Sequence, residues 1–235
     1  VYCSVSAFGQ TGPRATEGGF DMTVQAMSGV MSVTGEPGGR PAKCGIPIAD
    51  FTAGLYGAFS IACALLKARA TGSGDHIDVS MLGGMLGIAN LQTSELFGTG
   101  RDPVRLGSAH PMNAPYAAFA CRNGYFALAA GTNKLWQETC AGIGRTDLAQ
   151  DPRSATPGLR ATHQASQPAL ASSSSALNAA KRSVVRSCSV HEVSSVSRTA
   201  DALWKGPNQR LPSFTIRRVT STRGQGSWTV TFTLT

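Results

Sequence analysis

The chain has 235 residues, of which 42% are hydrophobic, so it is long enough to bury one large core or two small ones. Its net charge of +8 is unevenly placed: residues 1–150 contain ten Lys or Arg and ten Asp or Glu, whereas residues 151–235 contain eleven against three. The basic part has no long Lys/Arg runs interleaved with aromatics, which argues against a nucleic-acid-binding protein, and no apolar run reaches the length expected of a membrane span.

The first predicted element is a β-strand at residues 1–6, in which apolar residues alternate with more polar ones. A loop with the sequence FGQTGP, residues 8–13, ends this strand. The sequence GGFD then opens a short helix that ends at Gly29. Asp21 stands in the first turn of this helix, where the helix dipole favours a negative charge.

Residues 44–82 predict a βαβ-like unit, around which we expect the fold to be organised. An apolar extended run ends at Asp50, and a second apolar run covers residues 76–82. Between them, residues 51–70 have the period of a helix with one apolar face. This face consists of Leu55, Phe59, Ala62, Cys63 and Leu66. Asp50 is therefore predicted to lie at the junction between a strand and a helix.

Two interpretations of Asp50 follow from this position. Aspartate is common as a helix N-cap, because its side chain accepts hydrogen bonds from free backbone N–H groups, and caps far outnumber catalytic carboxylates. A carboxylate at a helix N-terminus is also oriented and kept anionic, and neighbouring N–H groups can stabilise an oxyanion on the group that it attacks. The spacing permits a nucleophile without requiring one.

The second half of the chain predicts the start of a smaller domain. Two short alternating strands, residues 116–119 and 125–129, are joined by an Arg-Asn-Gly turn. Residues 133–143 follow as a helix. We therefore expect α/β architecture, with a large α/β domain at residues 1–103 and the start of a small α+β domain at residues 104–153.

Residues 154–235 differ from the rest in composition. They are rich in Ser, Thr and Arg and show no sustained period until the alternating SWTVTFTL near the end. Such a change fits a shifted reading frame or a mis-predicted exon. The alternative is a disordered basic tail that binds RNA or an acidic partner. We prefer the first interpretation and expect this tail to be disordered rather than a domain.

The six cysteines and four histidines show no spacing typical of a metal site, so we expect no bound metal. The start of the chain has no signal-peptide pattern, and the thiols are expected to be reduced, as in a cytoplasmic protein. The chain also begins directly in a strand and without a methionine. We therefore expect it to be a fragment of a longer protein.

Four motifs occur in a fixed order, namely VYCSVSAFGQTGP, GGFDMTVQAMSGVMSVTGEP, GIPIADFTAGLYGA and TGSGDHIDVSML. In this order and at this spacing they resemble the family III CoA-transferases of the CaiB/BaiF type, which also include carnitine-CoA, formyl-CoA and methylacyl-CoA racemase enzymes. The resemblance continues through RLGSAHPMNAPYAAFACRNGYFALAAGTNKLWQETCAGIGRTDLAQDPR to Arg153, and looks most like members that transfer CoA between small dicarboxylic acids. It implies an open Rossmann-like large domain whose opening βα units would precede Val1.

The resemblance also implies site residues besides Asp50. Gln10 lies in the loop that lines the reaction site of the family. Phe20 stands where the racemase branch of the family has a histidine that carries a proton, and Asp21 stands at the acid that follows it. Phenylalanine cannot carry a proton, so racemase chemistry is disfavoured. Gly107 and His110 lie in the loop that closes over the acyl group in the family. These five residues are candidates for binding the substrate or CoA.

The implied activity is transfer of CoA from an acyl-CoA thioester to a carboxylic acid acceptor through a covalent intermediate on Asp50. Coenzyme A is then a substrate, and no permanently bound cofactor is expected. The implied partners are acyl-CoA, small carboxylic acids and a second copy of the chain in a homodimer, but no membrane and no nucleic acid. Three alternatives stay open: an inactive fragment of such an enzyme, an acyl-CoA racemase, and a protein that binds through its basic tail.

Overall fold

The computed structural model describes residues 1–121, 124–163, 215–221 and 228–233. The chain divides into two compact units, Val1–Arg105 with Arg210–Thr235, and Leu106–Gln209. Both units combine helices with strands, and the predicted α/β class is confirmed.

The first unit contains a four-stranded sheet with the strand order β2-β1-β6-β5. Its strands are β1 (Tyr2–Ser6), β2 (His76–Ser80), β5 (Thr215–Ser221) and β6 (Trp228–Thr233). β1 runs parallel to β2, with Cys3 opposite Ile77 and Val5 opposite Val79, whereas β6 runs antiparallel to β1. The strand predicted at residues 1–6 is confirmed as β1. Because β1 and β2 are parallel, the chain between them must cross over from one end of the sheet to the other.

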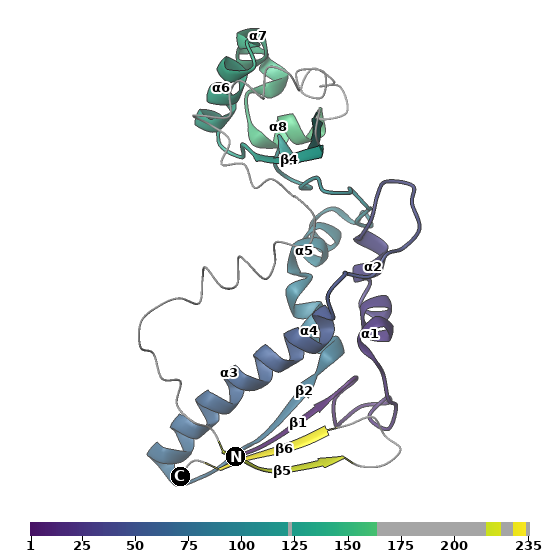
Figure 1. The fold of residues 1–235 in the computed structure, drawn as a ribbon, viewed down its shortest axis with the longest axis vertical. Helices are drawn as coiled ribbons and strands as arrows, with labels where there is room; N and C mark the ends of the chain where they lie inside the picture. The colour runs from purple at the N-terminus through teal and green to yellow at the C-terminus, as the bar shows by residue number, and fades with distance from the viewer. Residues whose placement is uncertain (122–123, 164–214, 222–227, 234–235) are drawn as a thin grey trace. The chain divides into compact units, whose positions relative to one another are not determined.

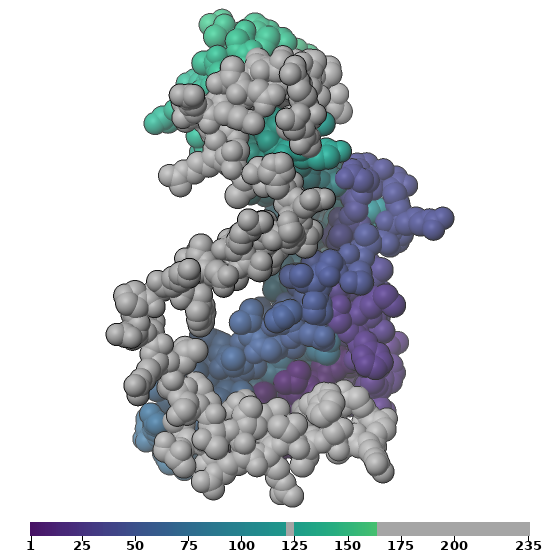
Figure 2. Space-filling view, viewed as in Figure 1, coloured from purple at the N-terminus to yellow at the C-terminus, as the bar shows by residue number. Residues whose placement is uncertain are grey.

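The helix in this crossover is α3 (Ile48–Thr71), which lies along one face of the sheet (Figure 1). The predicted helix is thus confirmed, starting three residues earlier than expected. A Cβ on Gly57 would lie 3.8 Å from Cγ2 of Val79 and 4.0 Å from Sγ of Cys3, so the helix approaches both strands closely. In the space-filling view α3, in blue, lies against α1, in purple (Figure 2).

No strand occurs in the described chain between residues 34 and 47, contrary to the extended run that we expected before Asp50. Pro41 and Pro47 have no N–H to donate to a sheet, and the N–H of Cys44 donates instead to Oε1 of Gln25 (2.8 Å). β1 takes the place of the expected strand in the βαβ unit. Asp50 is therefore the third residue of α3 and does not follow directly on a strand.

The outer side of α3 is apolar and exposed. The face that the sequence period indicated includes Leu55, Phe59 and Leu66, whose exposed fractions are 72%, 71% and 67%. The buried residues of α3 are smaller: Ala49, Thr52, Ala53, Gly57 and Ala64. With its 24 residues, α3 also has the length and apolar composition of a membrane-crossing helix, so the expectation that no segment reaches that length is wrong.

The described part of the first unit also contains α1 (Asp21–Met27), α2 (Val30–Val33), α4 (Met81–Ile88) and α5 (Asn90–Thr99). The helix predicted to open at GGFD is confirmed as α1. The second strand ends at Ser80, two residues earlier than expected, because the Ser80 hydroxyl accepts the N–H of Gly83 (3.1 Å) and caps α4. A core of apolar residues joins the sheet to α1, α3 and α4: Cys3, Ala7, Val24, Ala49, Ala53, Val79, Met81 and Met85.

The second unit contains an antiparallel hairpin followed by helices. Its elements are β3 (Tyr116–Cys121), β4 (Gly124–Ala129), α6 (Asn133–Gly142), α7 (Thr146–Gln150), a 3-10 turn (Pro152–Ser154) and α8 (Pro157–Thr162). The hairpin and α6 share a core made of Phe126, Leu128, Ala130, Trp136, Cys140 and Ile143. The predicted hairpin and the predicted helix at residues 133–143 are both confirmed.

Parts of the expected tail are ordered elements, which differs from the sequence interpretation. Thr156 accepts the N–H of Leu159 (3.2 Å) and caps α8, whose first residue is Pro157, a helix start that the composition argument overlooked. β6 covers most of the alternating SWTVTFTL and pairs with β1. The rest of the expected tail lies outside the described residues.

The side chain of Arg160 joins α8 to the rest of the second unit. It is 0% exposed, and its Nε donates to the carbonyl of Ala114 (2.7 Å). Its Nη1 donates to the carbonyl of Ser154 (2.8 Å) and to Oδ1 of Asn133 (3.0 Å). The guanidinium also lies 5.4 Å from the ring centroid of Trp136. Residues up to α8 therefore pack as part of this unit.

Candidate active site

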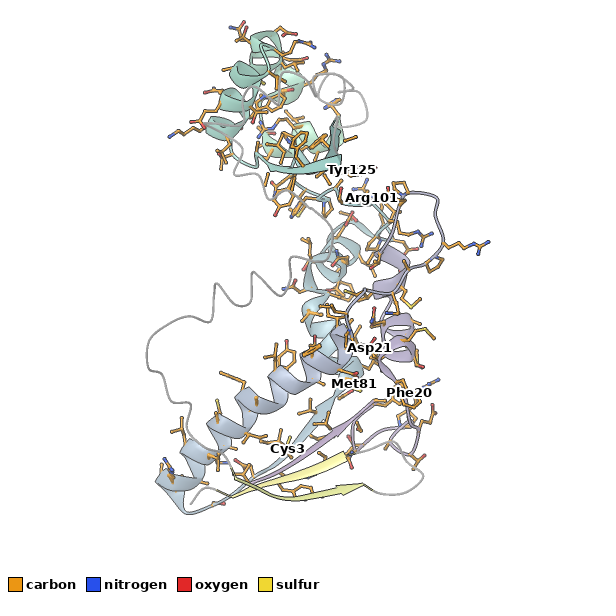
Figure 3. The ribbon with its side chains drawn as sticks, viewed as in Figure 1. Cys3, Phe20, Asp21, Met81, Arg101 and Tyr125 are labelled. Carbon is orange, nitrogen blue, oxygen red and sulfur yellow. The ribbon has the colours of Figure 1, made fainter. Side chains whose placement is uncertain are left out.

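A cavity of ≈ 820 Å³ lies in the first unit beside β1 and the N-terminal end of α3. Its lining residues are Val5, Ser6, Gly18, Gly19, Phe20, Thr23, Asp50, Ala53, Gly54 and Met81. Phe20 and Met81, labelled in Figure 3 with the neighbouring Asp21, mark this end of the unit. Asp50 is the one ionisable residue among these lining residues. The cavity therefore combines a single carboxylate with uncharged walls, which are small or apolar apart from the hydroxyls of Ser6 and Thr23.

Asp50 projects from the first turn of α3 and is exposed to the cavity. Among the described residues none donates a side-chain hydrogen bond to its carboxylate, so the carboxylate oxygens are free to react. Burial in the cavity raises the pKa of Asp50 above its ordinary value, and the negative charge of Asp21 raises it further. The interpretation of Asp50 as the N-cap is wrong, because Pro47 occupies that position.

The cap of α3 comes from Asp21, at the start of α1. Its Oδ1 accepts the N–H of Ala49 (2.8 Å), and its Oδ2 accepts a hydrogen bond from Nε2 of Gln25 (2.7 Å). Gln25 is fully buried and uses its Oε1 to accept the N–H of Cys44 (2.8 Å). Asp21 was expected to bind substrate or CoA, but its carboxylate is occupied by protein donors and it does not line the cavity.

Two of the backbone N–H groups at the start of α3 are already bonded. The N–H of Ile48 donates to the carbonyl of Ile46 (2.8 Å), and that of Ala49 donates to Asp21. They cannot also serve an oxyanion, as the sequence interpretation allowed. Gly19, another lining residue, leaves no room for a side chain, since a Cβ there would lie 2.8 Å from the Cβ of Ala7.

The other predicted site residues of the first unit lie at or next to the cavity. Phe20 lines it and is 85% exposed. Gln10 donates from Nε2 to the hydroxyl of Ser6 (3.3 Å), a lining residue, and from its backbone N–H to Oδ2 of Asp78 (2.8 Å). The structure therefore brings Phe20 to the cavity and places Gln10 one contact away.

Gly107 and His110 belong to the second unit and are not among the cavity residues. The backbone N–H of His110 donates to the carbonyl of Tyr116 (3.0 Å). Its Nδ1 accepts the N–H groups of Met112 (3.1 Å) and Asn113 (3.2 Å). These contacts fix the loop conformation, while the predicted role of Gly107 and His110 at the acyl group stays a prediction.

Sequence reasoning did not single out Gln25. Its position four residues after Asp21 on one helix is the signal that could have found it, because side chains at this spacing meet. In the described part of the chain, no group of three or more His, Cys, Asp or Glu could hold a metal ion. The cavity chemistry described above rests on one carboxylate and its supporting hydrogen bonds.

The model of CoA-transferase family III matches residues 1–208 of the chain. The chain belongs to this family. The resemblance inferred from the motifs is confirmed, and it reaches beyond Arg153, where we expected it to stop.

Three similar proteins agree with this assignment. A succinate–glutarate CoA-transferase of Agrobacterium fabrum is 40% identical over 164 residues, which cover 70% of this chain and 41% of that protein. An acetyl-CoA:oxalate CoA-transferase of Acetobacter aceti is 40% identical over 154 residues, covering 65% of this chain and 40% of that protein. A solved CaiB/BaiF family protein from Brucella suis is 34% identical with a TM-score of 0.67, covering 84% of this chain and 54% of that one. The chain thus spans under half the length of these two CoA-transferases.

Proposed function

We propose that this chain carries the nucleophile of a CoA-transferase that moves CoA from an acyl-CoA to a small dicarboxylic acid, and that the nucleophile is Asp50. The observation that carries the proposal is the position of Asp50: a carboxylate without hydrogen-bond donors among the described residues, facing a cavity whose other lining residues are uncharged. The similar CoA-transferases act, by their names, on succinate, glutarate and oxalate.

The cavity suits the reacting end of an acyl-CoA. Its ≈ 820 Å³ lies within the range of about 300–1,000 Å³ that is usual for small-molecule sites. Gly18, Gly19, Ala53 and Gly54 leave room beside the carboxylate, and the other nucleophilic groups of the lining are the neutral hydroxyls of Ser6 and Thr23. An acyl anhydride hydrolyses readily, so bound substrate must displace water from this cavity, in which Asp50 and Phe20 are exposed.

In the first step the carboxylate of Asp50 bonds to the thioester carbonyl carbon, the C–S bond breaks, and CoA leaves as a thiolate. Asp50 then carries a mixed anhydride. The thiolate attacks the Asp50 carbonyl of this anhydride, which releases the donor acid as a carboxylate and leaves CoA on Asp50 as a thioester. Each step exchanges one acyl bond for another, so no redox chemistry is required.

The acceptor repeats these steps in reverse. Its carboxylate attacks the aspartyl thioester, releases the CoA thiolate and forms a second mixed anhydride with Asp50. The thiolate then attacks the acceptor's carbonyl, which completes the new acyl-CoA and restores the free carboxylate of Asp50. Asp50 must be ionised to start, so its raised pKa predicts that activity falls as the pH drops through that raised value.

A transfer assay tests this proposal. The 235-residue chain is incubated with succinyl-CoA or acetyl-CoA and with isotope-labelled oxalate, succinate or glutarate, and new acyl-CoA is measured by mass spectrometry. Asp50→Asn should abolish transfer because an amide is not a nucleophile. Asp75→Asn is the matched control, since Asp75 pairs with Lys67 at the opposite end of α3 and should not affect transfer.

Transfer by Asp50→Asn at the rate of the unchanged chain would contradict the assignment of the nucleophile. Absence of transfer by the unchanged chain with every donor and acceptor would contradict the proposal for this chain and favour the inactive fragment. Exchange of the α-proton of a branched acyl-CoA with solvent would instead favour a racemase, for which Phe20 supplies no proton carrier.

A further inference from the structure

Both carboxylate oxygens of Asp21 accept hydrogen bonds from other parts of the first unit. One oxygen receives the N–H of Ala49 and the other receives Nε2 of Gln25. Gln25 cannot turn its amide over, because its Oε1 receives the N–H of Cys44. Asparagine at position 21 would therefore direct its own NH2 group against that of Gln25, so only a carboxylate satisfies all the donors.

This arrangement ties three separate segments together. The start of α1, the segment before α3 and the first turn of α3 are linked by hydrogen bonds of 2.7 Å and 2.8 Å. Asp50 directly follows Ala49, the residue whose N–H is held. Any shift of the Ala49 backbone therefore also shifts the carboxylate that faces the cavity.

We propose that Asp21 is a positioning residue of this site, which acts through Ala49 and Gln25 to fix the first turn of α3, and that the site requires its charge as well as its shape. The role in catalysis rests on the proposed function of Asp50. The structural part stands on the hydrogen bonds of Asp21 alone.

The charge of Asp21 also acts on the reactivity of Asp50. Desolvation by burial raises the pKa of the Asp50 carboxyl, and the negative charge of Asp21 raises it in the same direction. The lining residues from β1 (Val5 and Ser6) and α4 (Met81) carry no charge. Since a more basic carboxylate is a stronger nucleophile, Asp21 both holds Asp50 and increases its nucleophilicity.

Three variants separate the shape of Asp21 from its charge. Asp21→Ala removes both acceptors, whereas Asp21→Asn keeps the acceptor for Ala49 and loses the one for Gln25. The double variant Asp21→Asn with Gln25→Glu exchanges the two groups: the Asn NH2 donates to one Glu oxygen, while the other accepts the N–H of Cys44. Asp75→Asn again serves as the matched control.

Two readouts are measured on each variant of the full chain: the unfolding equilibrium constant by denaturant titration, and the pKa of Asp50 by 13C NMR of its carboxyl group. Asp21→Ala should raise the unfolding constant roughly 5- to 30-fold, as loss of a cap and a buried partner does. Asp21→Asn should raise it less, and the double variant should recover part of that loss. Both single variants should lower the pKa of Asp50, which a purely structural role would not do.

An unchanged pKa of Asp50 in Asp21→Asn would overturn the electrostatic part of the proposal. A double variant less stable than Asp21→Asn would overturn the donor and acceptor argument, even if Asp21→Ala does not fold. Neither result depends on CoA transfer. If transfer does not require Asp50, the proposed function fails while these two readouts still decide the role of Asp21.

Discussion

Replacing Arg160 by alanine is expected to destabilise the second unit by about 3 kcal/mol, because three acceptors, two of them in buried hydrogen bonds and one in a part-buried one, lose their donor at roughly 1 kcal/mol each. The acceptors are the carbonyls of Ala114 and Ser154 and Oδ1 of Asn133. Contact with the ring of Trp136 adds to the loss. Burial of the guanidinium, which lowers the pKa of Arg160, costs desolvation energy, and alanine removes this cost. The two effects act in opposite directions, so the expected loss of stability stays near the value for the hydrogen bonds.

Native-state hydrogen exchange of the full chain measures this loss where it is expected, at the amides of β4 and α6. Arg160→Lys should lose most of the same free energy, because a single ammonium cannot span acceptors that the guanidinium reaches from two nitrogens. Arg153→Ala is the control, since Arg153 pairs with Asp151 on the surface and should leave exchange in these elements unchanged. Unchanged exchange rates of the β4 and α6 amides in Arg160→Ala would refute this reasoning. They would show that α8 does not stabilise the second unit.

Three further outcomes are expected. Gly19→Ala should destabilise the first unit by about 1–3 kcal/mol in a denaturant titration, because its Cβ would meet the Cβ of Ala7 at 2.8 Å. Gly54→Ala has no atom within 4 Å of its new Cβ and should stabilise α3 by about 0.5–1 kcal/mol. A change in unfolding free energy of the same sign for Gly19→Ala and Gly54→Ala would contradict the packing described for the cavity wall. Iodoacetamide at pH 8, followed by peptide mass mapping, should label exposed Cys63 well before buried Cys140, whose pKa burial raises to about 11; equal rates would contradict the core of the second unit.

The extent of α3 could be predicted from the sequence, but its packing side could not. The period of Leu55, Phe59 and Leu66 indicates one apolar face, and these side chains are exposed in the structure. The sheet instead packs on small residues such as Gly57, which carry little hydrophobic signal but permit a close approach. Periodicity reports which residues share a face and not which neighbour is available to cover it.

The cap of α3 shows a second limit of sequence reasoning. Spacing offered Asp50 as a possible cap, yet Asp21, 28 positions before Ala49, supplies the oxygen that accepts the N–H of Ala49. Local spacing cannot reveal such a contact, because it depends on the packing of α1 against α3. The sequence position identified Asp50 as a candidate for two roles, helix cap and nucleophile. The fold excludes the first, because Asp21 caps α3 instead.

The expected tail illustrates a third limit. A rise in Ser and Arg indicated loss of structure after Arg153, whereas Thr156 and Pro157 begin α8 and Arg160 is buried. Composition averages over many residues and misses a short helix that one cap and one buried side chain define. β6 likewise covers most of the alternating SWTVTFTL, inside the stretch that was expected to be disordered.

The most direct test of the central claim is to trap the covalent intermediate on Asp50. The chain is incubated with succinyl-CoA, quenched with hydroxylamine, digested and mapped by mass spectrometry, with Asp50→Asn as the control. Hydroxylamine attacks an anhydride or a thioester, so Asp50 should be converted to a hydroxamate, at a rate that falls as the pH drops through its raised pKa. A hydroxamate on another residue, or none at Asp50 while CoA transfer proceeds, would contradict the account.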